Sequence, residues 1–363
     1  MRVTLGDVCE KGASNLKQSD VVNMTGEYPI YGAAGYIGNV DFYHQEKPYV
    51  AIVKDGAGIG RTTLYPAKSS VIGTMQYLLP KDNVLPEYLC YVVRHMHLEK
   101  YFTGATIPHI YFRDYKNEQF NLDSLDKQAE IIEILGKAES IILKRRKELA
   151  ELDNLIKARF VEMFGIYPAN QMGWETGKIR DTVADVRYGS SRPAVDGGKY
   201  PYLRMNNITY GGELDLSDVK RIDVPENELD KCTVRRGDVL FNRTNSKELV
   251  GKTCVYDRDE MMVLAGFVIR VRVNDRVLPE FLSAFLNTDF SKKTLSEMCK
   301  AAIGQANINA QEMQNIGLYL PPLELQRQFV QFKKQADKSK AAVQQALDKA
   351  QLLFDSLMQE YFG

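Results

Sequence analysis

The sequence predicts an α+β protein, with two mixed α/β globular domains separated by two long antiparallel coiled-coil helices in a pseudo-two-fold internal repeat. Three observations predict this fold. Two helical stretches match without a gap, both have the apolar spacing of a coiled coil, and the segments before them share strand and helix signals. We expect a first globular domain over residues 1–121, a helix over 122–165, a second globular domain over 166–319 and a second helix over 320–363.

The two helical stretches are related by one offset of 198 residues, which takes Leu122 to Leu320 and Gly165 to Gly363. The second stretch begins with Pro321-Pro322, which is typical of the entry to a helix. Both stretches end in Phe-Gly, and glycine suits a helix C-terminus. Identical residues at this offset include Leu122/Leu320, Leu125/Leu323, Gln128/Gln326, Ala138/Ala336, Leu149/Leu347, Leu155/Leu353, Glu162/Glu360 and Phe164/Phe362.

Apolar residues in both helices recur at alternating steps of three and four, the spacing of a coiled-coil seam. A helix of roughly 38 residues at about 1.5 Å per residue spans on the order of 57 Å, and so narrow a seam suits another helix. We therefore expect the helices to pair with each other, antiparallel. Packing of each helix on its own domain and homodimerisation are the alternatives. The residues assigned to the helix-pair and subunit interface are Ile142, Leu149, Leu152, Ile156, Leu347, Phe354 and Leu357.

The globular segments repeat one another in outline. Residues 84–89 (VLPEYL) parallel residues 277–282 (VLPEFL), and each run opens a stretch typical of a helix before a glycine-containing loop. A strand-like run over residues 49–53 precedes the loop DGAGIGRT, and its counterpart over residues 238–241 precedes NRTNSKELVGKT. Each domain is therefore expected to mix strands with helices.

Composition and charge narrow the class of protein. The 363 residues are 44% hydrophobic, which is enough for buried cores, and the five cysteines lack CxxC spacing, which favours a reducing compartment. The N-terminus does not resemble a signal peptide and no apolar run of about 18 residues occurs, so we expect a cytoplasmic protein. Lys plus Arg and Asp plus Glu both number 47, which counts mildly against a nucleic-acid binder. Any DNA contact must therefore come from a local basic face.

Motifs for catalysis or cofactor binding are missing. Pro321-Pro322 lacks the polar and aromatic neighbours of an amino-methyltransferase loop, and the glycine-rich residues 55–61 precede a strand-like run instead of a phosphate-binding helix. No GxxxxGK[ST] or GxSxG motif occurs, and the four histidines are too scattered for a metal site. We expect a non-catalytic chain with no metal and no cofactor of its own.

Three kinds of segment combine side chains suited to DNA bases and phosphates. The first is a basic cluster over residues 231–254, with the loop at 54–62 as its counterpart in the first domain. The second covers residues 202–208 with the loop 189–193, and the third is the late loop of each domain, where His109 aligns with Asn307. Solvated loops and helix caps are the structural alternatives. The candidate DNA-binding residues are Lys54, Arg61, Thr62, Thr106, His109, Arg192, Arg204, Asn206, Asn207, Arg243, Asn245, Ser246, Lys247, Lys252, Gln305 and Asn307.

Six short stretches accompany the two different globular domains and their long repeated helices. They are YPIYG at 28–32, GATIPHI at 104–110, LDKQ at 125–128, GDVLF at 237–241, RTNS at 243–246 and GQANI at 304–308. Together with the repeat, these stretches resemble the specificity (S) subunits of Type I restriction–modification enzymes. The resemblance covers essentially the whole chain.

The resemblance implies that each globular domain is a target recognition domain that reads one half of a split double-stranded DNA site. It also implies that the helices fix the spacing of the half-sites and dock two methyltransferase subunits. Those subunits would supply the S-adenosylmethionine site and flip the target adenine, and restriction/translocase subunits would join to cut. The chain itself is then a non-catalytic subunit in host defence. Because the two domains carry different loops, we expect a bipartite, asymmetric target.

Three other interpretations are weighed against this one. A recognition domain of another restriction enzyme class predicts methyltransferase or nuclease motifs, which the chain lacks. A non-DNA protein-binding scaffold, with two interaction domains joined by a coiled coil, fits the neutral charge better and the matched polar loops worse. An RNA binder would need aromatic residues for base stacking, and the candidate loops lack them.

Overall fold

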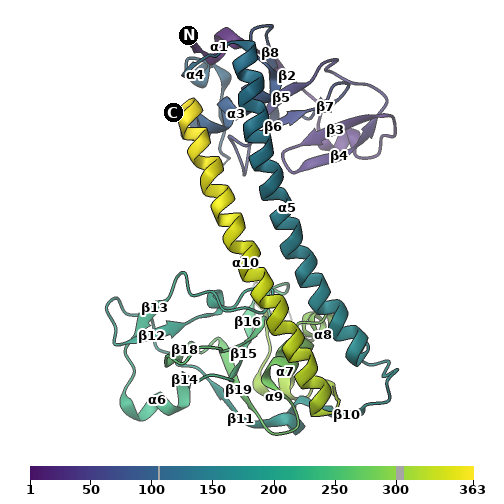
Figure 1. Ribbon diagram of the computed structural model, residues 1–363, viewed down its shortest axis with the longest axis vertical. Coiled ribbons are helices and arrows are strands. Elements are labelled where there is room, and N and C mark those ends of the chain that lie inside the picture. Colours follow the sequence, from purple (N-terminus) through teal and green to yellow (C-terminus); the bar gives the residue numbers. More distant parts are fainter. Residues whose placement is uncertain (105–106, 300–305) are drawn as a thin grey trace. The chain divides into compact units, whose positions relative to one another are not determined.

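The computed structural model describes residues 1–104, 107–299 and 306–363 (Figure 1). Contacts divide these residues into two compact units. Unit 1 holds Met1–Arg146 with Gln344–Gly363, and unit 2 holds Lys147–Val343. Each unit therefore combines one globular domain with half of each long helix, and the four-segment division made from the sequence stays a prediction.

Unit 1 is built on two sheets (Figure 1). The larger is antiparallel, in the order β2 (Cys9–Ala13), β8 (Met75–Pro80), β5 (Tyr49–Val53), β6 (Thr62–Tyr65). Strand β5 lies between two neighbours and is buried at every position, which explains its unbroken apolar sequence. Helix α3 (Pro86–His95) begins with proline and packs on β5 and β6. The smaller sheet has the order β4 (Gly35–Val40), β3 (Tyr28–Gly32), β7 (Ser70–Val71).

The first and last strands of the domain in unit 1 are neighbours. Strand β1 (Arg2–Thr4) pairs antiparallel with β9 (Gln119–Asn121), and the long helix α5 (Leu125–Phe164) begins shortly after β9. The remaining elements are short: α1 (Leu5–Val8), α2 (Gln18–Val21), the 3-10 helix η1 (Leu98–Tyr101) and α4 (Phe112–Tyr115). The domain is therefore closed by its own ends.

Unit 2 repeats this plan. Its larger antiparallel sheet has the order β11 (Val183–Tyr188), β19 (Val268–Val273), β15 (Val239–Asn242), β17 (Thr253–Val255). Helix α7 (Pro279–Leu286) packs on β15 and β17, as α3 packs on β5 and β6. The second sheet has the order β13 (Lys220–Ile222), β12 (Tyr200–Leu203), β18 (Met262–Leu264), β14 (Thr233–Val234). Strand β10 (Glu175–Lys178) closes the domain by pairing antiparallel with β21 (Gly317–Leu320).

The remaining elements of unit 2 are short. They are η2 (Ile179–Thr182), η3 (Met205–Asn207), α6 (Glu226–Cys232), β16 (Thr244–Asn245), α8 (Asp289–Met298), β20 (Ala306–Asn307) and α9 (Ala310–Gln314). The Tyr-Pro strands of the two smaller sheets also correspond, because β3 pairs in parallel with β7 and β12 pairs in parallel with β18. The repeat recognised in the helices therefore extends to the topology of both domains.

The long helices α5 (Leu125–Phe164) and α10 (Leu323–Phe362) have 40 residues each. Helix α10 begins directly after the two prolines. Gly165 follows α5 with φ +79 and donates its N–H to the Val161 carbonyl at 2.8 Å. In the three described ranges, no helix is both long and apolar enough to cross a membrane. The two long helices predicted from the sequence are present as α5 and α10.

The helices run antiparallel within each unit. In unit 1, Ile131 and Leu135 of α5 share a core with Met358 of α10, and Arg146 donates to Gln351 Oε1 at 3.5 Å. As residue numbers rise along α5, those of the partners on α10 fall. The same core includes residues of the sheet and of α3, so the helices pack on the domain as well as on each other.

In unit 2 the helices also run antiparallel. The Lys340 ammonium lies 2.6 Å from the Asp153 carboxylate, and the rings of Phe160 and Phe329 meet edge to face with centroids 5.2 Å apart. Among the predicted interface residues, Ile142 is buried, Ile156 packs on the core of unit 2, and Phe354 and Leu357 pack on the core of unit 1. Three are half-buried: Leu149, Leu152 and Leu347.

One fully buried glutamine attaches each long helix to its domain. Gln128 Oε1 accepts from the Leu85 N–H and Gln326 Oε1 accepts from the Leu278 N–H, both at 2.8 Å. These leucines are the N-cap residues of α3 and α7, so each glutamine satisfies a backbone group at a helix start. The amide nitrogens donate to carbonyls at 2.8–3.2 Å, which are those of Asn83 and Asp123 in unit 1, and Arg276 and Pro321 in unit 2.

Candidate functional site

The two candidate loops of unit 1 meet just beyond β5. The backbones of Asp55 and His109 form an antiparallel bridge, and the Ile110 N–H donates to the Lys54 carbonyl at 2.9 Å. His109 Nδ1 lies 2.7 Å from an Asp55 carboxylate oxygen, and the Lys54 ammonium pairs with the other. These side chains are partly exposed. We call Lys54, Asp55 and His109 junction 1.

The corresponding loops of unit 2 meet just beyond β15. The two-residue strands β16 and β20 pair antiparallel, and the Ile308 N–H donates to the Arg243 carbonyl at 2.9 Å. The Thr244 hydroxyl donates to Asn307 Oδ1 at 3.2 Å. We call Arg243, Thr244 and Asn307 junction 2.

The two junctions correspond position by position. In each, a basic residue directly follows the central strand of the larger sheet, and its carbonyl binds an amide of the late loop. The residue after the basic one forms a hydrogen bond with the polar side chain of the late loop. The corresponding positions are Lys54 and Arg243, Asp55 and Thr244, His109 and Asn307, and Ile110 and Ile308. The structure thus brings the first and third candidate segments together in both units.

An exposed tyrosine stands beside each junction. The Arg243 guanidinium carbon lies 5.0 Å from the ring centroid of Tyr188, and Arg243 Nε has no hydrogen-bond partner among the described residues. In unit 1, the Tyr111 ring stacks on His109 with centroids 6.3 Å apart and carries the Arg113 guanidinium at 5.0 Å. Both tyrosines are 44% exposed. Sequence reasoning missed both, although Tyr111 stands only two residues after His109.

Three of the predicted DNA-binding side chains are buried and serve the fold, because protein groups already satisfy their polar atoms. Thr62 Oγ1 donates to the Gly60 carbonyl at 3.0 Å, and Lys252 Nζ donates to the Met205 carbonyl at 2.9 Å. Burial lowers the pKa of Lys252. Asn207 Nδ2 donates to two carbonyls at 2.8 and 3.0 Å, and its Oδ1 accepts from the Arg204 N–H at 2.9 Å.

The other predicted residues within the described ranges are exposed or half-buried. Arg192 pairs with Glu228 at 2.8 Å and Arg204 pairs with Asp218 at 2.8 Å, so each arginine has an internal carboxylate partner. Arg61 is exposed and donates to the Ala33 carbonyl at 3.1 Å. Asn206 and Lys247 are exposed, and Asn245 and Ser246 are half-buried beside junction 2. The predictions for Thr106 and Gln305 lie outside the described residues.

In the described ranges, no group of three or more His, Cys, Asp and Glu side chains is placed to hold a metal ion. The sequence profile of the Type I restriction modification DNA specificity domain matches residues 1–154 and 172–351 of the chain.

The chain belongs to this family.

Individual specificity subunits are also similar to the chain in sequence. The EcoKI specificity subunit of the Type I restriction enzyme from Escherichia coli (strain K12) is 25% identical over 229 residues, which cover 61% of this chain and 49% of that subunit. The chain therefore spans about half the length of the curated relatives it matches. The family resemblance inferred from the sequence is confirmed by the profile and by this relative.

Two solved structures share the fold. The S subunit of a Type-I restriction-modification system from M. genitalium gives a TM-score of 0.59 at 13% identity and covers 100% of this chain and 96% of its own. A chain from a structure of complex assembly and conformational transition in the type I R-M system gives a TM-score of 0.56 at 16% identity. It covers 99% of this chain and 97% of its own. The predicted fold class of this specificity-domain protein is confirmed.

Proposed function

We propose that the chain is the DNA sequence-recognition subunit of a Type I restriction–modification enzyme. In this proposal it binds a bipartite, asymmetric double-stranded target and scaffolds methyltransferase and restriction subunits. The observation that carries the proposal is the pair of junctions, which stand at equivalent places in two repeated domains but carry different side chains. Two equivalent surfaces with different chemistry are what an asymmetric, split target requires.

Each junction fixes the orientation of one polar side chain. Asp55 engages Nδ1 of His109, which leaves Nε2 on the outer side of the ring. Thr244 engages Oδ1 of Asn307, which leaves the amide nitrogen on its outer side. A histidine that donates from Nδ1 accepts at Nε2, whereas the asparagine amide nitrogen donates. The two junctions therefore offer opposite hydrogen-bonding groups to base edges in a DNA groove.

Each junction also contains a basic residue that can contact DNA. Arg243 has a planar guanidinium that can contact the O6 and N7 atoms of guanine together, and Tyr188 supports the guanidinium plane. Lys54 has a single ammonium group held against Asp55, which suits a phosphate or a guanine edge. The exposed Lys247, beside Asn245 and Ser246, suits the DNA backbone next to junction 2.

The partners proposed for the chain fit its long helices. The helical segments of unit 1 expose apolar side chains away from the shared core, namely Ile141, Leu143, Leu352 and Leu353. Exposed apolar side chains on a helix are compatible with a protein–protein contact. We assign this surface to methyltransferase subunits. They, and not this chain, would carry S-adenosylmethionine and the catalytic groups, and restriction/translocase subunits would join the complex.

Single-molecule sequencing of methylated bases tests the target of the complex. In a strain that expresses the whole system, the methylated motif should be split and asymmetric, and a palindromic motif would sink the proposal. The variants His109→Ala and Asn307→Ala should each relax one base position, in opposite half-sites. Relaxation of the same half-site by both variants would contradict the assignment of one junction to each half.

Binding measurements on the assembled methyltransferase complex test the role of Arg243. Loss of a bidentate base contact costs about 1–3 kcal/mol, so Arg243→Ala should weaken specific DNA binding by roughly 5- to 150-fold. Arg258→Ala is the matched control, because Arg258 is exposed and follows the end of β17 that pairs with the start of β15, whereas Arg243 follows the other end of β15. Equal affinities of the two variants would remove Arg243 from the site.

The neutral net charge suggests that partner subunits share the grip on DNA phosphates. A salt titration of the lone chain separates the two cases, since each phosphate contact adds about 0.9 to the slope of log K against log salt. We expect a shallow slope for the lone chain and a steeper one for the complex. A steep slope for the lone chain would count against shared phosphate contacts.

A further inference from the structure

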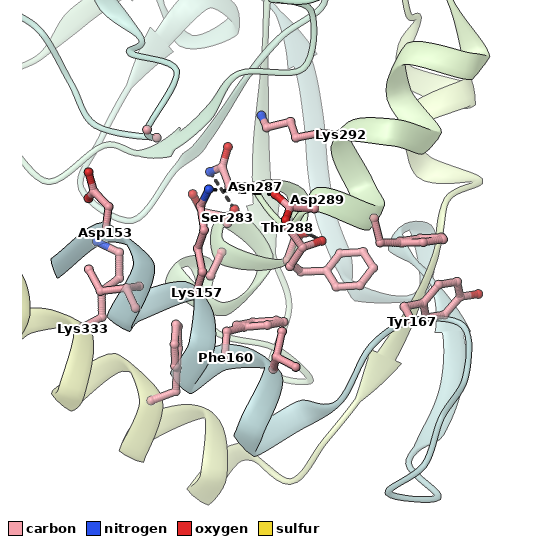
Figure 2. Close-up of a pocket in the computed structure, with 18 of the residues that line it drawn as sticks. Asp153, Lys157, Phe160, Tyr167, Ser283, Asn287, Thr288, Asp289, Lys292 and Lys333 are labelled. Carbon is pink, nitrogen blue, oxygen red and sulfur yellow. Dashed lines mark hydrogen bonds and ion pairs between the residues drawn. The ribbon is translucent and has the colours of Figure 1, made fainter. Parts of the chain in front are cut away.

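Unit 2 contains a cavity of about 470 Å³ that the DNA-recognition proposal does not use (Figure 2). Its walls come from the paired helices α5 and α10, from α7 and α8, and from the loop at residues 210–213. Figure 2 shows Lys292 and Asn287 on one side, with Phe160 and Lys333 of the paired helices on the other. Cavities of this size hold small-molecule ligands in many proteins.

Larger side chains stand at the corresponding positions of unit 1. The Tyr91 hydroxyl of α3 donates to Glu139 Oε2 at 2.8 Å, and Arg94 Nη1 lies 2.7 Å from Glu139 Oε1. These contacts join α3 to α5 across the gap between them. Tyrosine, arginine and glutamate therefore close this part of unit 1.

The corresponding residues of unit 2 are all shorter. Aligning residues 84–89 with 277–282 places Ala284 and Asn287 where unit 1 has the tyrosine and the arginine. The helix repeat places Asp337 where unit 1 has the glutamate. All three shorter residues line the cavity. The cavity is therefore a specific difference between two halves that otherwise share a fold.

Lys292 is the distinctive charged group of this cavity. The other lysines that line it have carboxylate partners, Lys157 with Asp289 at 3.9 Å, Lys333 with Asp337 at 2.6 Å and Lys340 with Asp153 at 2.6 Å. Within the described part of the chain, Lys292 has no carboxylate within 4.0 Å, and its ammonium donates to the Gly251 carbonyl at 2.8 Å. Burial, with the nearby charges of Lys252 and Lys157, lowers the pKa of Lys292 to about 8. An anion would relieve this cost of burial.

The cavity also offers an unfilled acceptor and an apolar wall. Asn287 Oδ1 is buried without a donor among the described residues, although its Nδ2 donates to the Thr253 carbonyl at 2.7 Å. A buried acceptor left unpaired costs free energy, which a ligand N–H would recover. Aromatic rings form much of the remaining wall, including those of Phe160, Phe285 and Tyr210.

We propose that this cavity binds a small molecule with a flat apolar body, one anionic group and one N–H donor. The anion pairs with Lys292, the N–H donates to Asn287 Oδ1, and the flat body lies against the aromatic wall. We assign the site to unit 2, because the corresponding positions of unit 1 hold the larger Tyr91 and Arg94, both bound to Glu139.

Isothermal titration calorimetry of the full chain with indole-3-acetate tests the proposal, because this probe has all three features. The neutral 3-methylindole keeps the flat body and the N–H but lacks the anion. We expect one indole-3-acetate site per chain and at least tenfold weaker binding of 3-methylindole. Absence of indole-3-acetate binding at millimolar concentration, or equal affinity for both probes, would overturn the proposal.

Three variants locate the site. Lys292→Gln should weaken indole-3-acetate at least tenfold and leave 3-methylindole unchanged, whereas the matched control Lys293→Gln, on the exposed side of α8, should change neither. Ala284→Tyr introduces the side chain that fills unit 1 and should abolish binding of both probes. Unchanged Trp174 fluorescence shows that each variant is folded. Wild-type affinity in Lys292→Gln or in Ala284→Tyr would exclude this cavity as the binding site.

Discussion

The change Gln326→Met tests whether one buried side chain attaches the long helix to the domain in unit 2. Gln326 is 0% exposed and makes three hydrogen bonds, one from the Leu278 N–H and two to backbone carbonyls. Methionine has a similar length and volume, so the packing changes little while all three bonds are lost. The variant therefore isolates the hydrogen bonds.

The expected cost follows from the groups left without partners. An unsatisfied buried N–H costs about 1–3 kcal/mol, and each carbonyl that loses a bond adds about 0.5–1.5 kcal/mol. The free energy of unfolding of unit 2 should therefore fall by about 3 kcal/mol. That difference lowers the folding equilibrium constant by roughly 100-fold.

Urea unfolding followed by Trp174 fluorescence measures this change, because Trp174 is the single tryptophan of the chain and lies in unit 2. Its indole N–H donates to the Phe164 carbonyl at 3.1 Å, at the end of α5. With typical urea dependences of about 1–3 kcal/mol per molar, the midpoint should fall by about 1–3 M.

Two further variants make the result specific. Gln331→Met changes an exposed glutamine of the same helix, so its midpoint should match that of the unaltered chain. Gln128→Met removes the equivalent bonds in unit 1 and should leave the Trp174 transition unmoved. A midpoint for Gln326→Met within about 0.3 M of the unaltered chain, where a fall of about 1–3 M is expected, would refute the reasoning.

Three other predictions concern stability and reactivity. Phe329 is 0% exposed and its ring packs against the rings of Phe160 and Phe164. Phe329→Ala should therefore lower the free energy of unfolding of unit 2 by about 3–5 kcal/mol in the same urea assay, and a loss under about 1 kcal/mol would contradict this. Burial disfavours the Asp185 carboxylate, but the Arg270 guanidinium at 2.8 Å helps to outweigh it and lowers the pKa of Asp185 below its ordinary 3.8. Asp185→Asn should therefore cost about 2 kcal/mol at pH 7, and the difference should disappear as the pH falls through the lowered pKa; a loss independent of pH would point to packing instead. All five cysteines are buried, and burial raises the pKa of Cys9 to about 12. The folded chain should therefore react slowly with Ellman's reagent at pH 8, whereas the unfolded chain should expose five thiols. Fast reaction of the folded chain would contradict this.

The helices and the repeat could be predicted because their signals are local. A three-four spacing and a constant offset of 198 residues need no knowledge of distant contacts. The same alignment marked Gln128 and Gln326 as identical, but their role appears only when Leu85 and Leu278 are seen beside them. A repeat in the sequence thus identified equivalent residues before it revealed their purpose.

The candidate site was harder to predict because it depends on pairing and exposure. Thr244 and Asn307 are 63 residues apart in the chain and meet only through the pairing of β16 with β20. Residue type also says little about exposure, since Lys252 is buried and its ammonium donates to a backbone carbonyl of its own domain. Two sequence signals pointed to the junctions, namely the alignment of His109 with Asn307 and the matching of the loops that follow residues 49–53 and 238–241.

The pairing of first and last strands has a consequence for how such genes change. Strand β1 pairs with β9 and β10 pairs with β21, and every sheet of the described residues lies inside one unit. The first and last strands of each domain therefore lie side by side, so the chain enters and leaves the domain at the same place. A crossover between related genes within the two helix-coding stretches would exchange one entire domain without dividing any sheet. Under the function proposed above, the lineage would then acquire a new half-target in one step while the other half is inherited intact.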